Sequence, residues 1–248
     1  MYDETSQYPE KPSKLKHWKA YLFDFLLLFA AVSLGFFADN LRENFSDKQQ
    51  GKEYIRSFYA DLQTDTAIIS GIIRYEEEKA SILEAIYPCW DSVSNNIPTC
   101  VANLVRHARV NMPFIMTEST FQQLVNVGGF RFLSKQDADS ILQYMTMYRA
   151  LQDHQETIYQ ETQIVVRATS NTLIDVATIT QLRNITKNDR GFTLASNTPV
   201  FTSTDKILIN RFFNELNTYR QVTLAHVNQL KRLKLKQIRL LHYLDEKY

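Results

Sequence analysis

The chain has 248 residues, of which 44% are hydrophobic and 22% charged, and its formal net charge at pH 7 is +1. This length can bury one sizeable core, and the near-neutral charge excludes the basic excess typical of a nucleic-acid-binding protein. The sequence contains neither the glycine-rich motifs of nucleotide sites nor the short motifs of serine hydrolases, zinc proteases or CxxC proteins. We therefore expect no enzymatic activity, no cofactor, no metal site and no nucleic-acid partner.

An apolar run from Tyr21 to Phe37 is typical of a membrane-spanning helix. Its eleven Leu, Phe and Val residues favour insertion by about 3 to 7 kcal/mol, which exceeds the cost of about 2.5 to 3.5 kcal/mol for Asp24 at mid-bilayer. As a helix, the segment from residue 20 to residue 38 measures about 28 Å, close to the roughly 30 Å hydrocarbon core. The sequence thus predicts a cytoplasmic tail, a transmembrane helix and an extracytoplasmic domain, at residues 1–19, 20–38 and 39–248.

A cleaved signal peptide is the alternative interpretation, because secreted chains also begin with lysines followed by an apolar run. No small-x-small cleavage site follows the apolar run, since Phe36 and Phe37 precede Ala38. The orientation follows from the lysines before the span, which outnumber the basic residues directly after it. They are Lys11, Lys14, Lys16 and Lys19, against Arg42 and Lys48. We therefore expect an inner-membrane protein with a cytoplasmic N-terminus and a periplasmic main domain.

Asp24 is the candidate functional residue of the span, because an ionisable group inside a membrane usually faces protein or water. One interpretation makes the span a contact surface for another membrane protein or a second copy. The small residues Ser33 and Gly35 favour it, because they let another helix approach closely. The other interpretation is that the carboxylate of Asp24, one turn from the interface, reaches the cytoplasmic lipid head groups.

The extracytoplasmic part reads as long helices with a cap of short ones. Apolar residues at three- and four-residue steps continue the first helix to about Tyr87. Ser134 and Asp137 form a variant capping box that opens a second long helix, with Ile158 and Val165 among its apolar positions. Thr204 similarly opens a third. The expected fold is all-α, with the transmembrane helix continuing into an elongated bundle of three long helices that run up, down and up.

Shorter elements connect the long helices. We expect short helices over 99–110 and 117–127, the second ended by Gly128 and Gly129. The segment from residue 179 to residue 203 is rich in Thr, Asn and Ser and is predicted to be a loop with a short extended piece.

Cys89 and Cys100 are the only cysteines, and they flank a predicted turn region. In an oxidising compartment they are expected to pair, which stabilises a loop of this size by roughly 3 kcal/mol. The alternative is a pair of free buried thiols in a cytoplasmic domain. The predicted orientation favours the disulfide.

Other polar residues have mainly structural interpretations. His154 and His226 fall near apolar stripes, where a histidine is usually a hydrogen-bonded core residue and less often a ligand or pH sensor. The acidic run at Glu76 to Glu78 and the basic run at Lys231 to Arg239 are expected to lie side by side, although such runs are more often solvated faces than sites.

Two stretches carry a resemblance to a known family: the one from Trp18 to Asp65, including FFADNLRENFSDKQQGKEYIRSFYADLQTD, and TFQQLVNVGGFRFLSKQDADSILQYMTMY from Thr120 to Tyr148. The chain resembles an uncharacterised Bacteroidota family of single-span envelope proteins, catalogued as a domain of unknown function. A tryptophan is common there at the exit from the span, where this chain has Ala38. The resemblance implies an inner-membrane anchor and a periplasmic helical domain, and no activity.

Three functions remain open. The one favoured is a non-catalytic subunit or scaffold whose span and outer faces contact other proteins of a membrane assembly. The second is a periplasmic sensor that binds a small ligand among its helices; since residues 1–19 contain no output domain, it would signal through a partner span. The third is an enzyme whose site assembles only in three dimensions.

Overall fold

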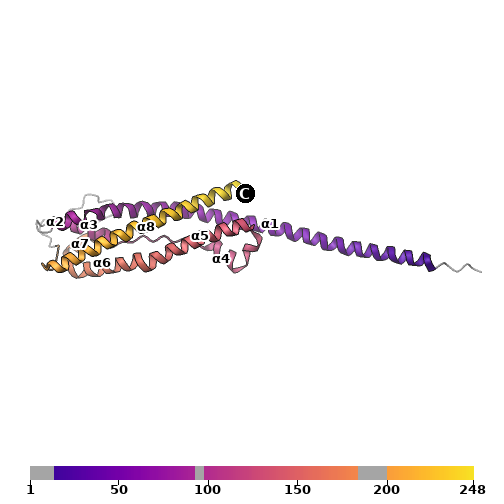
Figure 1. Cartoon of the computed structure of the whole chain (residues 1–248), viewed down its shortest axis with the longest axis horizontal. Coiled ribbons are helices and arrows are strands. Elements are labelled where there is room, and N and C mark those ends of the chain that lie inside the picture. Colours follow the sequence, from indigo (N-terminus) through magenta and orange to yellow (C-terminus); the bar gives the residue numbers. More distant parts are fainter. Residues whose placement is uncertain (1–13, 93–97, 184–199) are drawn as a thin grey trace, which may run out of the picture. The chain divides into compact units, whose positions relative to one another are not determined.

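The computed structural model describes residues 14–92, 98–183 and 200–248. They form helices, and the only paired extended residues among them are the isolated bridge partners Ile174 and Phe201 (Figure 1). The predicted all-α class is therefore confirmed. The chain divides into an N-terminal unit that ends at Glu53 and a C-terminal unit that begins at Tyr54.

Helix α1 runs from Lys14 to Ile82 and is 69 residues long. It is followed by the 3-10 turn η1 (Leu83–Ala85) and by α2 (Ile86–Ser92). Pro88 accounts for this change, because a proline ring clashes with the carbonyl four residues earlier and the α-helical pattern is replaced there by the tighter turn. The prediction of helix to about Tyr87 is confirmed, with this interruption.

Two further long helical segments complete the bundle. The first consists of α5 (Lys135–His154), the π turn η4 (Gln155–Tyr159) and α6 (Gln160–Leu173); the second is α8 (Lys206–Lys247). Ser134 caps α5 as predicted, since its hydroxyl oxygen accepts the backbone N–H of Asp137 at 3.2 Å. The predicted cap of α8 was one residue off. Asp205, not Thr204, is the N-cap, because its carboxylate accepts the N–H of Ile207 at 2.8 Å.

The π turn η4 rotates the buried face of the second long segment. A π turn contains one residue more than an α turn, so the positions after it are displaced by about one residue. Ile158 and Val165, predicted on the apolar face, are about half exposed, whereas Tyr159 and Val166 are buried. The regular periodicity assumed from the sequence was therefore wrong at Ile158 and Val165, whereas Leu173 is buried as this periodicity predicts.

Helix α8 runs antiparallel to α1. Three side-chain contacts show the direction, because later residues of α1 and η1 contact earlier residues of α8. The pairs are Tyr59 with Asp245, Glu77 with Lys231, and Glu84 with Arg220. The C-terminus consequently lies at the end of the C-terminal unit where α1 enters it (Figure 1). The predicted up-down-up order, which placed it at the opposite end, was wrong.

An extended segment between α3 and α4 explains the order. The N–H of Met112 donates to Glu76 at 3.3 Å and the N–H of Thr117 donates to Asp65 at 3.0 Å, so this segment descends beside α1. It returns the chain to the end at which α1 enters before α5 begins. The α5–α6 segment then runs parallel to α1, and α8 runs back.

The short helices lie at both ends of the unit. Helices α3 (Pro98–Ala108) and α7 (Val176–Arg183) gather with α2 at one end, and α4 (Ser119–Asn126) with η3 (Gly129–Phe132) lies toward the other (Figure 1). Gly128 ends α4 with φ at 65°, as the glycine stop predicted. The predicted loop was partly wrong, because residues 179–183 belong to α7, and residues 184–199 lie outside the described part.

The core consists of two clusters of buried side chains. One joins α1, the extended segment, α4, α5 and α8, and includes Phe58, Leu62, Ile69, Phe114, Tyr144, Tyr148, Leu230 and Leu233. The other joins η1, α2, α3, η4, α6 and the first half of α8, and includes Leu83, Val105, Tyr159, Val166, Phe212, Leu216 and Tyr219. Several polar side chains of α1 and α8 are also buried, among them Glu76, Lys79 and His226.

Candidate functional sites

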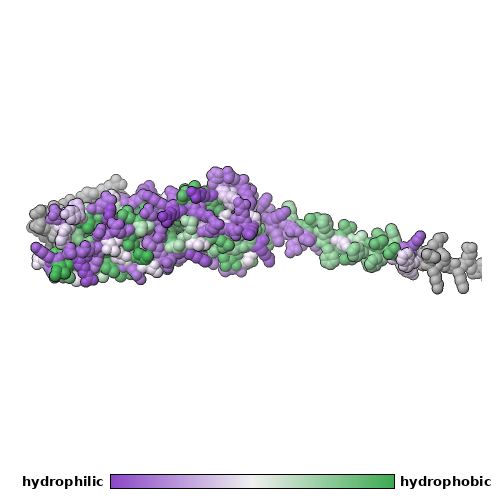
Figure 2. All heavy atoms as spheres, viewed as in Figure 1, coloured by the Kyte–Doolittle hydropathy of each residue, from purple (hydrophilic) through white to green (hydrophobic). Residues whose placement is uncertain are grey.

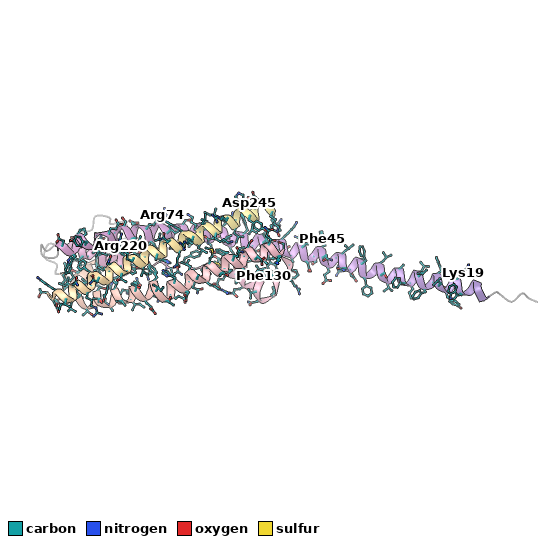
Figure 3. The ribbon with its side chains drawn as sticks, viewed as in Figure 1. Lys19, Phe45, Arg74, Phe130, Arg220 and Asp245 are labelled. Carbon is teal, nitrogen blue, oxygen red and sulfur yellow. A yellow bond between two sulfur atoms is a disulfide. The ribbon has the colours of Figure 1, made fainter. Side chains whose placement is uncertain are left out.

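The N-terminal unit presents the first candidate site, the apolar segment of α1. This is the one helix of the described residues that is long and apolar enough to cross a membrane, and every side chain from Trp18 to Ser46 is exposed. Figure 2 shows the hydrophobic residues as a continuous stretch of the helix, and in Figure 3 their side chains, between Lys19 and Phe45, project from it on all sides. Such a surface needs a cover of lipid or of other helices.

The three predicted contact residues of the span do not share one face. A residue advances about 100° around an α-helix, so Asp24 and Gly35 lie on the same face, whereas Ser33 lies on the opposite one. Leu28 and Ala31 fall on the face of Asp24 and Gly35. All three predicted residues are exposed, and the backbone of Gly35 has open space where a side chain would be.

Cys89 and Cys100 lie together between α2 and α3. Their sulfur atoms are at bonding distance and their Cα atoms are 5.7 Å apart, within the usual range for a disulfide. The pair ties the end of the first long helical run to the start of α3. The compartment that would keep such a bond oxidised stays a prediction.

A buried ion pair lies in the middle of the bundle. Lys79 and Glu76 are both fully buried, and the Lys79 ammonium contacts the two oxygens of Glu76 at 3.0 and 2.8 Å. The ammonium also donates to the hydroxyls of Tyr159 at 2.7 Å and Tyr219 at 3.2 Å. Tyr159 donates to Glu76, and Tyr219 donates to Asn111 at 2.6 Å. We call Glu76, Lys79, Tyr159 and Tyr219 the buried polar centre.

The surroundings of this centre shift the pKa values of its members. Burial lowers the pKa of Lys79, although the charge of Glu76 opposes the shift. Burial raises the pKa of both tyrosines, and the neighbouring charge of Glu76 raises them further. The ammonium of Lys79 has hydrogen-bond partners on Glu76, Tyr159 and Tyr219, so the geometry fits a structural ion pair that holds α1, η4 and α8 together.

The two histidines lie beside the buried polar centre. His226 is fully buried, and its ring stacks on Tyr159 at 4.4 Å between centroids and on His154 at 5.8 Å. Among the described residues, neither ring nitrogen of His226 nor Nε2 of His154 has a hydrogen-bond partner. The expectation of hydrogen-bonded core histidines was therefore wrong for these atoms. Burial lowers the pKa of His226 to about 3, with the charges of His154 and Lys79 acting in the same direction, so the ring stays neutral at neutral pH.

A cleft of about 880 Å³ opens between the end of α1 and α3. Its lining mixes apolar side chains with the polar groups of Tyr75, Glu78, Asn103, Arg106 and His107. Burial lowers the pKa of His107 and raises that of Tyr75 to about 12. Lys79 lines the cleft, whereas His154 and His226 do not.

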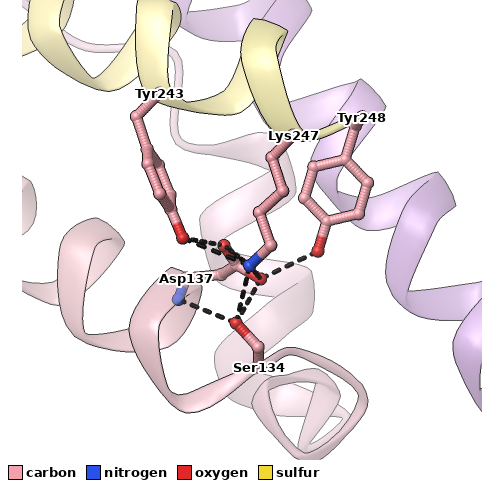
Figure 4. A network of polar contacts seen from close by, with 5 residues as sticks. All are labelled: Ser134, Asp137, Tyr243, Lys247 and Tyr248. Atoms are coloured by element: carbon pink, nitrogen blue, oxygen red, sulfur yellow. Dashed lines mark hydrogen bonds and ion pairs between the residues drawn. The ribbon is translucent and has the colours of Figure 1, made fainter.

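A second polar cluster connects the start of α5 to the end of α8 (Figure 4). Asp137 is fully buried at the start of α5 and accepts hydrogen bonds from Ser134 at 2.5 Å, Tyr243 at 2.7 Å and Tyr248 at 2.8 Å. Lys247 contacts its two oxygens at 2.7 and 2.8 Å. Burial raises the pKa of Asp137, but these four partners outweigh it and hold the pKa at about 2. We call this cluster the Asp137 latch.

The acidic and basic runs meet as predicted at one pair. Lys231 Nζ lies 2.6 Å from Glu77 on the surface. Glu76, the residue before Glu77, is buried in the core instead. Lys236 of the basic run donates to Gln143 at 3.0 Å. Of the Asp137 latch, only the Ser134–Asp137 cap could be predicted from the sequence, because the other members lie more than 100 residues further along the chain.

The described residues contain no group of three or more His, Cys, Asp or Glu side chains placed to hold a metal ion. In comparisons with protein-family models, curated proteins and solved structures, nothing matches this chain.

Proposed function

We propose that the chain is a single-span inner-membrane protein that acts without catalysis as a subunit or scaffold of a membrane assembly. In this proposal residues 1–19 are cytoplasmic, residues 20–38 cross the membrane, and residues 39–248 form a periplasmic helical domain, as in the Bacteroidota envelope family that the sequence resembles. The observation that carries it is the exposed apolar segment of α1, whose length of about 28 Å fits the hydrocarbon core.

The face of α1 that contains Asp24 supports a protein partner within the membrane. Ala31 and Gly35 are four residues apart on this face, the spacing of small residues that lets two membrane helices pack closely. A carboxylate beside such a pair gains a polar partner on the second helix, whereas an anchor without a partner gains nothing from it. The partner is another membrane protein or a second copy of this chain.

The test is co-purification in mild detergent of the tagged protein with its partners, followed by mass spectrometry. An interhelical hydrogen bond is worth about 0.6 to 2 kcal/mol, so Asp24→Leu should lower the recovered partner about threefold to thirtyfold while leaving insertion and folding intact. Ser33→Leu, on the opposite face, is the matched control and should keep the partner. Unchanged association of the Asp24 variant would contradict a partner contact at this residue. It would favour the interpretation that the carboxylate reaches the lipid head groups, and the helical bundle would remain as the candidate functional part.

Orientation is tested separately. In the proposed topology, protease added to spheroplasts digests the helical domain and spares an epitope placed in residues 1–19. Digestion of the tail tag with protection of the domain would reverse the topology without affecting the association result.

The cleft between α1 and α3 favours a second candidate function, a periplasmic ligand sensor that signals through a partner span. Its volume suits a small molecule, and its lining combines apolar side chains with a few polar groups, which is typical of ligand sites. A ligand seated there would contact α1, the helix that continues into the apolar segment. Screening small metabolites by the melting temperature of the purified protein tests it, with Asn103→Ala as the cleft variant.

A further inference from the structure

A second groove, distinct from the cleft near Lys79, lies between α2 and the first half of α8. It has a volume of about 520 Å³ and is lined on one side by Tyr87 and Trp90 of α2. On the other side stand three asparagines of α8, at positions 210, 214 and 217. We call it the α2–α8 groove.

The three asparagines form a ladder of free amide groups. Their spacing of four and three residues puts Asn210, Asn214 and Asn217 on one face of α8, over about 10 Å of helix. All three are exposed, and in the described part of the chain their side chains make no hydrogen bond. Each amide offers two donors and an acceptor, so the ladder can serve a ligand that carries alternating donors and acceptors.

The aromatic side supplies flat apolar surface. The ring of Trp90 packs edge-on against Phe213 at 5.5 Å, which fixes its orientation, and Tyr87 is 74% exposed. Arg220, at the end of the groove, donates to Glu84 at 3.0 Å, and its Nε is buried with no partner among the described residues. One fixed aromatic ring and one exposed aromatic ring therefore lie across the groove from the amide ladder.

From this arrangement we propose that the α2–α8 groove binds a saccharide of about two sugar rings. The apolar faces of the rings would lie on Trp90 and Tyr87, and their hydroxyl or acetamido groups would pair with the asparagine amides. Anionic ligands fit poorly, because Arg220 is the one cation of the lining and Glu84 already neutralises it. The lining residues of this groove belong to helices, so a peptide cannot bind here by adding a strand to a sheet edge.

Binding is measured on the full chain in phospholipid nanodiscs, because a maltoside detergent would itself present sugar. Replacing the other tryptophan, Trp18→Phe, leaves Trp90 as the only tryptophan, and its fluorescence is followed during titration with chitotetraose and with cellotetraose. We expect a saturable change with at least one of them. Preference for chitotetraose would assign the amide ladder to acetamido groups, and equal binding would assign it to hydroxyls.

The variant Asn214→Ala Asn217→Ala removes two neutral hydrogen bonds and should weaken binding about tenfold or more. Asn228→Ala, an exposed asparagine of the same helix outside the groove, should bind as the parent does. Tyr87→Ala should also weaken binding, and because this ring is exposed the fold should survive. The proposal is overturned by the absence of a saturable signal with either sugar, by equal affinity of the double variant, or by a response to an uncharged tetrapeptide alone.

Discussion

Lys247 holds both carboxylate oxygens of Asp137 across 110 residues of sequence, at 2.7 and 2.8 Å. The contact joins the last turn of α8 to the first turn of α5. Because α8 runs antiparallel to α1 and α5 begins where α1 enters the C-terminal unit, the Asp137 latch closes the bundle at that end.

Replacing Asp137 with asparagine should destabilise the C-terminal unit by about 2 to 3 kcal/mol. Hydrogen bonds to a charged group contribute about 1.5 to 3 kcal/mol, and the amide accepts fewer of them than the carboxylate. The measurement is urea unfolding followed by circular dichroism. Asp139→Asn, an exposed aspartate one half-turn away, is the control and should change the free energy of unfolding by less than about 0.5 kcal/mol. Equal stability of the two variants would contradict the role given to the latch.

The same carboxylate should make stability fall in strong acid. The pKa of Asp137 is about 2 in the folded chain and 3.8 without the fold. A group with a depressed pKa stabilises the fold fully above its unfolded value, and the contribution is lost as pH falls from about 3.8 to about 2. The loss amounts to about 2 kcal/mol. Unfolding free energies measured at several pH values should show this slope in wild type, and the Asp137→Asn variant should lack that part of it.

Glu76 and Glu77 are neighbours with opposite environments, and their glutamine variants should differ sharply. Glu76→Gln leaves the buried Lys79 ammonium without its counter-charge, which costs about 3 to 5 kcal/mol. Glu77→Gln breaks only the exposed pair with Lys231, which costs at most about 1 kcal/mol. Thermal and urea unfolding of the two variants, compared at one pH, give both numbers. A similar loss of unfolding free energy in both variants would show that the buried pair Glu76–Lys79 stabilises the fold no more than the exposed pair Glu77–Lys231 does.

How far the sequence predicts this molecule depends on whether the signal is local. The apolar segment, the Ser134 cap and the Gly128 stop are each local signals in the sequence. In the structure the apolar segment is helical, α5 begins after Ser134, and α4 ends before Gly128, as these signals indicate. The long helices also follow from periodicity. Local signals could not give the order of the helices, because it depends on the extended segment beside α1, which has no periodicity of its own.

The candidate sites were harder to predict for the same reason. Lys79 sits in a run of charged residues that reads as a solvated face, and only the approach of Tyr159 and Tyr219 from distant helices makes it a buried group. Tyr159 itself is placed by the π turn, which shifts the buried face by about one residue and has no recognised sequence signature. The α2–α8 groove likewise combines residues more than 100 positions apart.

The last prediction concerns Cys89 and Cys100, which we expect to be disulfide-bonded in the cell. Their Cα separation of 5.7 Å permits the bond without movement of the backbone. A bond of this kind persists in the periplasm and is rare in the cytoplasm, so its presence also bears on the proposed topology. Protein unfolded without reductant should take up no thiol label, and two labels after reduction. The Cys89→Ser Cys100→Ser variant should lose about 2 to 3 kcal/mol of stability, since the closed loop is short. Full labelling without reductant would show that the bond is absent and would weaken the assignment of the domain to the periplasm, while leaving the helical fold unaffected.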